Sequence, residues 1–168
     1  MDLSPHFRLK ELIPDGMETI DVPVEVLANL KSLCEEILEP LRVAMAAPIM
    51  IHSGYRPPDK NQAAGGVQAS DHLSGNAADF NVSATVAGTW EENTFLAFAW
   101  IRYYLVGKYG QVIAEDHRIA LKNPNKLWIH VSRPTEKHDG KPGDPNRVLV
   151  SFAPRHYEPW TEALEPLA

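Results

Sequence analysis

The 168-residue chain has the composition of one folded domain, with 44% hydrophobic and 23% charged residues. Its formal net charge of -6 argues against nonspecific binding to nucleic acid, which depends on Lys and Arg side chains that neutralise phosphates. Cys34 is the only cysteine, so an intramolecular disulfide and a cysteine-based zinc cluster are excluded. No stretch is long and apolar enough to span a bilayer. The first residues lack the basic start and apolar run of a secretory signal, so we expect synthesis in the cytoplasm.

The first half of the chain predicts an arm, a long helix and two strands. Residues 1–20 are expected to form an irregular N-terminal arm. Apolar residues at helical spacing predict an amphipathic helix over residues 23–45, with Pro40 as the place for a kink. Residues 48–53 and 77–82 have the apolar character of short buried strands.

The second half predicts one further helix and a set of strands. Periodic apolar residues indicate a helix over residues 91–109, ended by a glycine. Residues 111–115 and 127–132 are expected to be strands that flank a turn. The C-terminal region, residues 133–168, is expected to be rich in loops, with an edge strand over residues 147–152.

Together these elements predict a single α+β domain over residues 1–168. Its expected architecture is a small, mostly antiparallel sheet with helices packed on it. The segment 61–75 is rich in Gly, Ala, Ser and Gln and shows no hydrophobic periodicity. A loop of this length in a compact domain is usually functional or disordered, so this segment is the first place to search for a site.

The most informative segment runs from Ser70 to Asp79 and reads Ser-Asp-His-Leu-Ser-Gly-Asn-Ala-Ala-Asp. His72 is followed seven residues later by Asp79, and the small residues between them let the backbone turn closely. Zinc accepts imidazole nitrogen and carboxylate oxygen as ligands, so both side chains could converge on one ion. A His and an Asp in such a loop are also typical surface hydrogen-bonding groups, so the pair by itself leaves both interpretations open.

His130 is the best candidate for a third ligand. It lies in the otherwise apolar strand Leu-Trp-Ile-His-Val-Ser, in which residues 128, 130 and 132 share one face. A single histidine in such a strand is also typical of a hydrogen-bonded core residue. The combination of this histidine with the His72 and Asp79 pair favours a metal site.

Three short motifs follow one another along the chain: Ser53-Gly54-Tyr55-Arg56, Ser70-x-His72-x-x-Gly75-x-Ala77-x-Asp79 and Trp128-Ile129-His130. In this order and spacing, the chain resembles the zinc D-alanyl-D-alanine carboxypeptidases and the related peptidoglycan endopeptidases and phage endolysins. The segments Leu3-Ser4-x-x-Phe7-x-x-x-Glu11 and Ile37-Leu38-Glu39-Pro40-Leu41-Arg42 resemble the small, single-domain branch of that family. The resemblance covers residues from about 3 to 132.

The resemblance implies a role for each motif residue. His72, Asp79 and His130 would hold one zinc ion on the sheet, and the ion would keep an open position for water or substrate, as in catalytic zinc sites. Arg56 would lie beside the metal and either hold the substrate or stabilise a developing oxyanion. Ser70 would contact the substrate or orient the adjacent ligand.

The general base is less clear from the sequence. Several members of the family carry a Glu three residues before the last zinc histidine, but this chain has Leu127 there. The small branch carries its Glu at the end of the preceding strand, which corresponds to Glu115. Asp116 and His117 are the alternatives, and His117 would share a strand face with Glu115.

The resemblance therefore implies a hydrolase, namely a zinc metallopeptidase that acts on peptidoglycan peptides. It would cut amide bonds of D-Ala-containing stem peptides or cross-bridges, as a carboxypeptidase or an endopeptidase. Since no secretory signal is visible, we expect cell wall degradation after phage-type release, as for an endolysin. Two alternatives stay open: a non-catalytic zinc-binding structural or recognition module, and a hydrolase of amides or dipeptides outside the wall.

Overall fold

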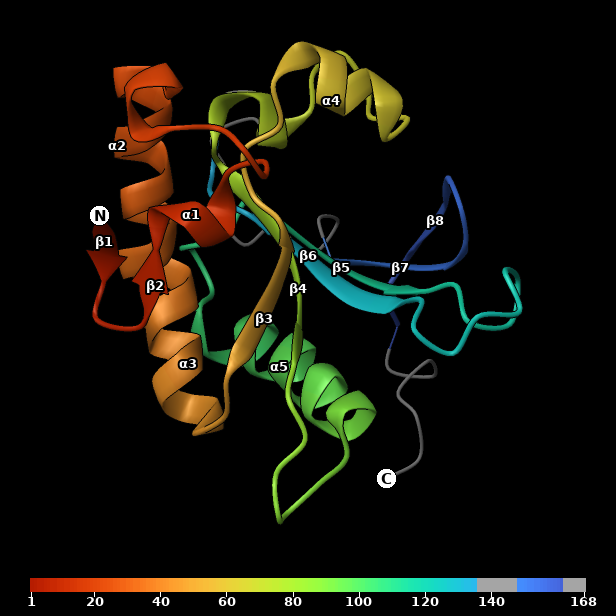
Figure 1. Cartoon of the computed structure of the whole chain (residues 1–168). Helices are drawn as coiled ribbons and strands as arrows, with labels where there is room; N and C mark the ends of the chain where they lie inside the picture. Colours follow the sequence, from red (N-terminus) through yellow and green to blue (C-terminus); the bar gives the residue numbers. More distant parts are fainter. Residues whose placement is uncertain (136–147, 162–168) are drawn as a thin grey trace.

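The computed structural model describes residues 1–135 and 148–161, and these form an α+β fold around a six-stranded sheet (Figure 1). The strand order is β3-β4-β6-β5-β7-β8. Neighbouring strands are antiparallel except for the parallel pair of β5 and β7, so the expected mostly antiparallel sheet is confirmed. The strands are β3 (Ile49–Ser53), β4 (Ala77–Val82), β5 (Gln111–Asp116), β6 (Leu127–Ser132), β7 (Val148–Ala153) and β8 (His156–Pro159).

The central strands have one apolar face and one polar face. Phe80 of β4 and Ile129 of β6 are paired in register and fully buried in the hydrophobic core. Helix α5 (Trp90–Tyr104) packs against β4, β5 and β6. Because successive side chains of a strand alternate between faces, Asp79 and His130 lie on the face opposite to that core. The site is therefore built on the sheet face that the core does not use.

The expected helix over residues 23–45 is present, but it contains a π-helical turn. It consists of α2 (Val24–Leu33), the π-helix Cys34–Leu38 and α3 (Glu39–Met45). Pro40 has no N–H to donate to the preceding turn. The wider turn places this proline at the start of α3, where a missing donor costs little.

The first twelve residues are ordered secondary structure, so the expectation of an irregular arm over 1–20 is wrong for this part. They form β1 (Asp2–Ser4), β2 (Phe7–Arg8) and α1 (Leu9–Leu12). Leu3, Phe7, Leu9 and Leu12 are at most 2% exposed. These elements are too short to show a period in the sequence, and they are held by burial against the core. A short 3-10 helix, Thr19–Asp21, follows.

Helix α5 is shorter than the expected range of 91–109. Thr89 caps its start, because its hydroxyl accepts from the backbone N–H of Glu92 while the Glu92 carboxylate accepts from the N–H of Thr89. The helix ends at Tyr104, ahead of a turn in which Gly107 adopts a φ of 85°. The apolar pattern continues into this turn, which explains why the predicted helix extends beyond the observed end.

The loop expected over residues 61–75 is partly helical. Helix α4 (Pro58–Ala63) extends into its first residues, and the 3-10 helix Asp71–Ser74 occupies its end. In the C-terminal region, the strand predicted over 147–152 corresponds to β7, but β8 pairs with it, so β7 is not an edge strand. Residues 136–147 and 162–168 lie outside the described part. No helix among the described residues is long and apolar enough to cross a membrane.

Candidate metal centre

His72 is held in place by a backbone carbonyl at the end of β3. It lies in the 3-10 helix Asp71–Ser74, which ends where Gly75 adopts a φ of 71°, and its side chain is only 2% exposed. Its Nδ1 lies 2.7 Å from the carbonyl oxygen of Gly54. A carbonyl can only accept, so Nδ1 carries the proton and Nε2 is left as a ligand atom.

Asp79 and His130 are brought together by the register of β4 and β6, in which they are direct partners. His130 Nδ1 lies 2.8 Å from Asp79 Oδ1. His72 Nε2 lies 3.2 Å from the same oxygen and 3.3 Å from His130 Nδ1. A tetrahedral zinc shell with ligand bonds of about 2.0–2.1 Å has edges of about 3.3 Å. The three ligand atoms are therefore spaced as three corners of such a shell, and this group could hold a metal ion.

Asp79 is kept ionised by its surroundings. Burial alone would raise the pKa of this carboxyl, but its interactions with His72 and His130 outweigh it and hold the pKa well below the usual range. A carboxylate beside two imidazole nitrogens is a donor set that suits zinc.

Arg56 contacts the second carboxylate oxygen of Asp79. Its backbone N–H donates to the carbonyl of His72 at 2.9 Å, which ties the turn after β3 to the histidine. Its Nη2 donates to Asp79 Oδ2 at 3.2 Å, while Oδ1 faces the histidines. Its buried Nε has no hydrogen-bond partner among the described residues. This arrangement orients the carboxylate and places the guanidinium beside the His/Asp/His group.

Glu115 faces this group, whereas the side chains of the other two predicted bases are hydrogen-bonded to other residues. Glu115 pairs with Trp128, two residues along from the pair of Ile113 and His130, so it shares their face of the sheet. Burial raises the pKa of Glu115 to about 7, and the nearby carboxylate of Asp79 adds to the effect, against the opposing charges of His130 and Arg56.

Asp116 and His117 are engaged elsewhere. Asp116 makes two hydrogen bonds of 2.8 Å to the guanidinium of Arg118. His117 is buried and lies 2.9 Å from the hydroxyl of Ser151. Of the three candidates in the sequence, only Glu115 is under the direct electrostatic influence of Asp79 and His130.

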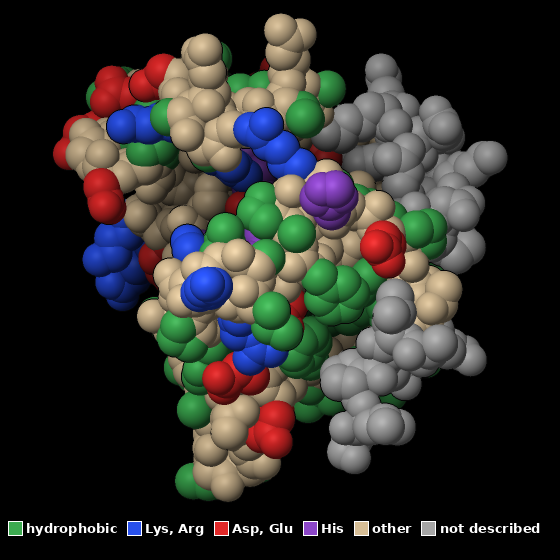
Figure 2. Space-filling view, turned by 90° about the vertical axis from the view of Figure 1, so that its right-hand side faces the viewer, with side chains coloured by type: hydrophobic (Ala, Val, Ile, Leu, Met, Phe, Trp, Pro, Cys, Tyr) green, Lys and Arg blue, Asp and Glu red, His purple; other side chains and the backbone are tan. Residues whose placement is uncertain are grey.

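A cleft of about 1390 Å³ runs over the site, and Ser70 lies in its wall with the metal-binding group, Arg56 and Glu115. One side is formed by α4 and the loop after it, and the other by the turn between β7 and β8. The two sides meet where Arg155 approaches Gly65, since a Cβ at that glycine would lie 2.7 Å from Arg155 Nη2. Figure 2 shows Lys and Arg side chains beside a hollow on this side of the molecule.

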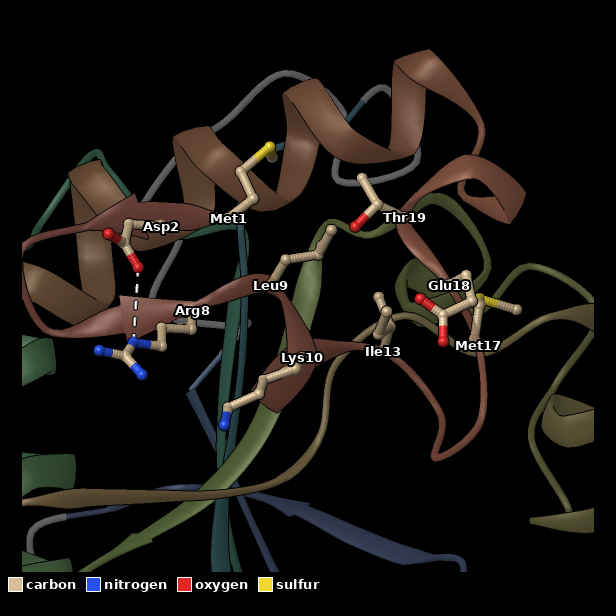
Figure 3. A pocket seen from close by; sticks show the side chains of 9 residues that line it. All are labelled: Met1, Asp2, Arg8, Leu9, Lys10, Ile13, Met17, Glu18 and Thr19. Carbon is tan, nitrogen blue, oxygen red and sulfur yellow. Dashed lines mark ion pairs between the residues drawn. The ribbon is translucent and has the colours of Figure 1, made fainter.

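A second cavity, of about 360 Å³, lies among the N-terminal residues (Figure 3). Its charged side chains include Asp2 and Arg8, which form an ion pair of 3.4 Å. It contains no histidine and lies apart from the His/Asp/His group, so it is not a candidate for the same chemistry. Its lining consists of Met1, Asp2, Arg8, Leu9, Lys10, Ile13, Met17, Glu18 and Thr19.

A family model described as Peptidase M15 matches residues 5–103, which is more than half of the chain. The chain belongs to the Peptidase M15 family. No match was found among curated proteins. Members of the M15 family are zinc-dependent peptidases, so this M15 protein is a metallopeptidase with a His/Asp/His group suited to the metal. The matched segment includes Arg56, His72 and Asp79, whereas His130 and Glu115 lie beyond it.

Sequence reasoning missed part of this M15 site. Ser151, Arg155 and Tyr157 come from β7, β8 and the turn between them, and no sequence signal placed this hairpin beside the zinc motifs. Tyr157 lines the cleft, and burial together with the charges of Glu115 and Asp79 raises its pKa. Its proximity to the site follows only from the pairing of β8 with β7.

Proposed function

We propose that this M15 protein hydrolyses amide bonds of peptidoglycan peptides, with zinc held by His72, Asp79 and His130 and with Glu115 as the general base. The observation that carries the proposal is the position of Glu115, a 9% exposed carboxylate on the same sheet face as the metal-binding group. A purely structural zinc site has no need of a buried acid beside it. We therefore favour an enzyme over a non-catalytic zinc module.

Zinc at this site would polarise the scissile carbonyl and activate a water molecule for attack. Glu115 accepts a proton from the water and passes it to the nitrogen of the leaving amine, so the carboxylate is regenerated in each cycle. Burial raises the pKa of Glu115 to about 7 in the metal-free protein, and the positive charge of zinc would favour the ionised form that a base needs. Leu127, where some relatives carry a Glu, is then no obstacle, because the base is supplied from the neighbouring strand.

Arg56 is proposed to bind the carbonyl oxygen of the scissile bond as negative charge develops on it. Its Nη2 is held by Asp79, which fixes the plane of the guanidinium. This contact orients the remaining N–H donors of the guanidinium, so they need no reorganisation during the reaction. Ser70 is proposed to contact the peptide along the wall of the cleft.

The substrate class is proposed from the resemblance of the motifs and from the lining of the cleft. Stem peptides of peptidoglycan carry carboxylates and D-Ala residues, and the cleft offers the cations Arg56, Lys126 and Arg155 along its walls. From the resemblance and these cations, we propose cell wall degradation as the biological role, in the manner of an endolysin that reaches the wall after phage-type release.

The test is hydrolysis of purified peptidoglycan and of D-Ala-containing peptides by the zinc-loaded protein. Glu115→Gln is expected to abolish cleavage with zinc still bound, while the matched variant Asp116→Asn keeps most of the activity. A zinc-loaded wild type that leaves all of these substrates intact would refute the proposal. Cleavage of L,L-dipeptides in preference to D-configured ones would point to an amide substrate outside the wall.

A further inference from the structure

His117 directly follows β5 and borders the cleft, but its side chain is almost entirely buried. It is 3% exposed, and its backbone N–H donates to the carbonyl of Lys126 at 2.7 Å. Its ring packs edge-on against the indole of Trp128, with ring centroids 4.9 Å apart and an interplanar angle of 82°. A histidine this deeply buried needs a partner for its ring N–H.

Ser151 supplies that partner and determines the tautomer of the ring. The Ser151 hydroxyl lies 2.8 Å from the carbonyl oxygen of Ala153 and 2.9 Å from His117 Nε2. The hydroxyl has one hydrogen, and the carbonyl can only accept it. Ser151 Oγ therefore accepts from His117, so the proton of the ring is on Nε2. Ser151 is itself 1% exposed, so this chain of hydrogen bonds is shielded from water.

The same nitrogen also faces Glu115. His117 Nε2 lies 3.6 Å from Glu115 Oε2. This distance is too long for a hydrogen bond, but it is short enough for the ring to restrict the movement of the carboxylate. Ser151 and Trp128 are the direct partners of Glu115 on the two neighbouring strands, and the Trp128 side chain gives the carboxylate a hydrogen bond. Glu115 is thus enclosed by Trp128 on one strand and by the His117 and Ser151 pair on the other side.

We propose that His117, locked by Ser151, is a positioning residue that holds the Glu115 carboxylate in its orientation toward the metal-binding group. This inference rests on the proposed role of Glu115 as general base. The three residues are not a nucleophilic Ser-His-Glu relay, in which serine and carboxylate engage opposite ring nitrogens. Here both contacts are made with Nε2, and the serine is buried.

The direct test compares three variants with the zinc-loaded wild type. His117→Leu removes the ring N–H and is expected to lower kcat for peptide hydrolysis about 10- to 100-fold, with KM and zinc content unchanged. His117→Gln retains a side-chain N–H and is expected to recover most of the loss. Ser151→Ala frees the ring and is expected to lower kcat about 10-fold. His156→Leu, on the exposed face of β8, is the matched control and keeps wild-type kcat.

A double-mutant cycle separates positioning from general destabilisation. In a Glu115→Gln background, His117→Leu is expected to cause no further loss of residual activity, because its effect acts through Glu115. Multiplicative losses would show that His117 acts independently of Glu115 and would overturn the proposal. A KM increase with unchanged kcat in His117→Leu would overturn it as well.

The outcome is distinguishable from a failure of the proposed function. If the wild type hydrolyses no peptide, the same cycle is read from urea unfolding of the wild type, the two single variants and the double variant. Non-additive changes in the free energy of unfolding then still establish that His117 holds Glu115, and additive changes refute it. If His117→Leu fails to fold, Ser151→Ala takes its place in the same cycle.

Discussion

Asp79 and His130 are direct partners on the adjacent antiparallel strands β4 and β6, with Oδ1 and Nδ1 2.8 Å apart. Two of the three candidate ligands are therefore fixed by backbone pairing near the middle of the sheet. Only His72 comes from a loop, and its ring is fixed by the Gly54 carbonyl. A site built in this way is organised before the ion arrives, so little conformational order has to be gained on binding.

We expect the wild type to bind one zinc ion per chain, and His72→Ala and His130→Ala to weaken binding by more than about 100-fold because each removes a ligand. Zinc at 100 times its Kd should raise the Tm of the wild type by about 5–10 °C. Elemental analysis and thermal unfolding measure these effects. His52→Ala, at an exposed histidine of β3, is the control. Equal zinc content in all four proteins would contradict the assigned ligands.

We expect Arg56→Lys to lower kcat about 100-fold while zinc stays bound. Lysine keeps the positive charge but loses the planar fork that contacts Asp79 and leaves further donors for substrate. Steady-state kinetics and zinc content of the purified variant measure this. Wild-type kcat in Arg56→Lys would show that charge alone suffices and that the geometry of the guanidinium has no catalytic role.

The pH dependence of stability of the metal-free protein should carry the signature of Glu115. Its pKa is about 7 in the folded protein against an ordinary value of 4.5. Between these values the folded state keeps a proton that the unfolded state has released, so this group makes stability fall as pH rises through the window. In Glu115→Gln, the decrease in the free energy of unfolding over this pH range should be smaller by up to about 3 kcal/mol. Urea unfolding at pH 5 and pH 8 measures it.

Asp116→Asn provides a contrast of opposite sign at lower pH, measured by extending the urea unfolding to pH 3. Burial raises the pKa of Asp116, but the hydrogen bonds and charge of Arg118 outweigh it and lower the pKa overall. Asp116 therefore contributes stability above its ordinary pKa of 3.8, and this contribution is lost as the pH falls. Parallel pH profiles for wild type and Glu115→Gln would show that Glu115 is not perturbed by burial.

Gly54→Ala should destabilise the fold and weaken zinc binding together. A Cβ at this position would lie 2.4 Å from the backbone oxygen of Leu12, so either α1 or the turn after β3 has to move. We expect a loss of about 1–3 kcal/mol, and lower zinc affinity because the Gly54 carbonyl orients His72. Gly88→Ala is the matched control, since its nearest neighbour is the side chain of Asn93. Equal stability of both variants would contradict this account.

Local patterns in the sequence predicted most of the strands and the candidate ligands. The strands predicted at 77–82 and 127–132 are present with the predicted bounds, because the residue pattern of a strand depends only on consecutive residues. His72, Asp79 and His130 were identifiable from residue type and spacing, and the structure brings them together. The role of each as a zinc ligand stays a prediction until metal content is measured.

Strand alternation alone could not choose among Glu115, Asp116 and His117. It placed Glu115 and His117 on one face, and their side chains do lie 3.6 Å apart. The structure distinguishes them because His117 Nε2 is hydrogen-bonded to Ser151, a partner 34 residues further along the chain. Likewise, the first twelve residues looked irregular because their elements are too short to have a period. Their order comes from burial against α2, the π-helix Cys34–Leu38 and β3.

The sequence by itself determined the family, the apolar faces of the central strands and the set of polar residues available for chemistry, because these depend on residue type and short-range periodicity. Only the tertiary structure determined the pairing of Asp79 with His130, the enclosure of Glu115 and the position of the β7–β8 hairpin at the cleft. These depend on register and on contacts between distant segments, whose free energy is set by packing of the whole core and not by any local pattern.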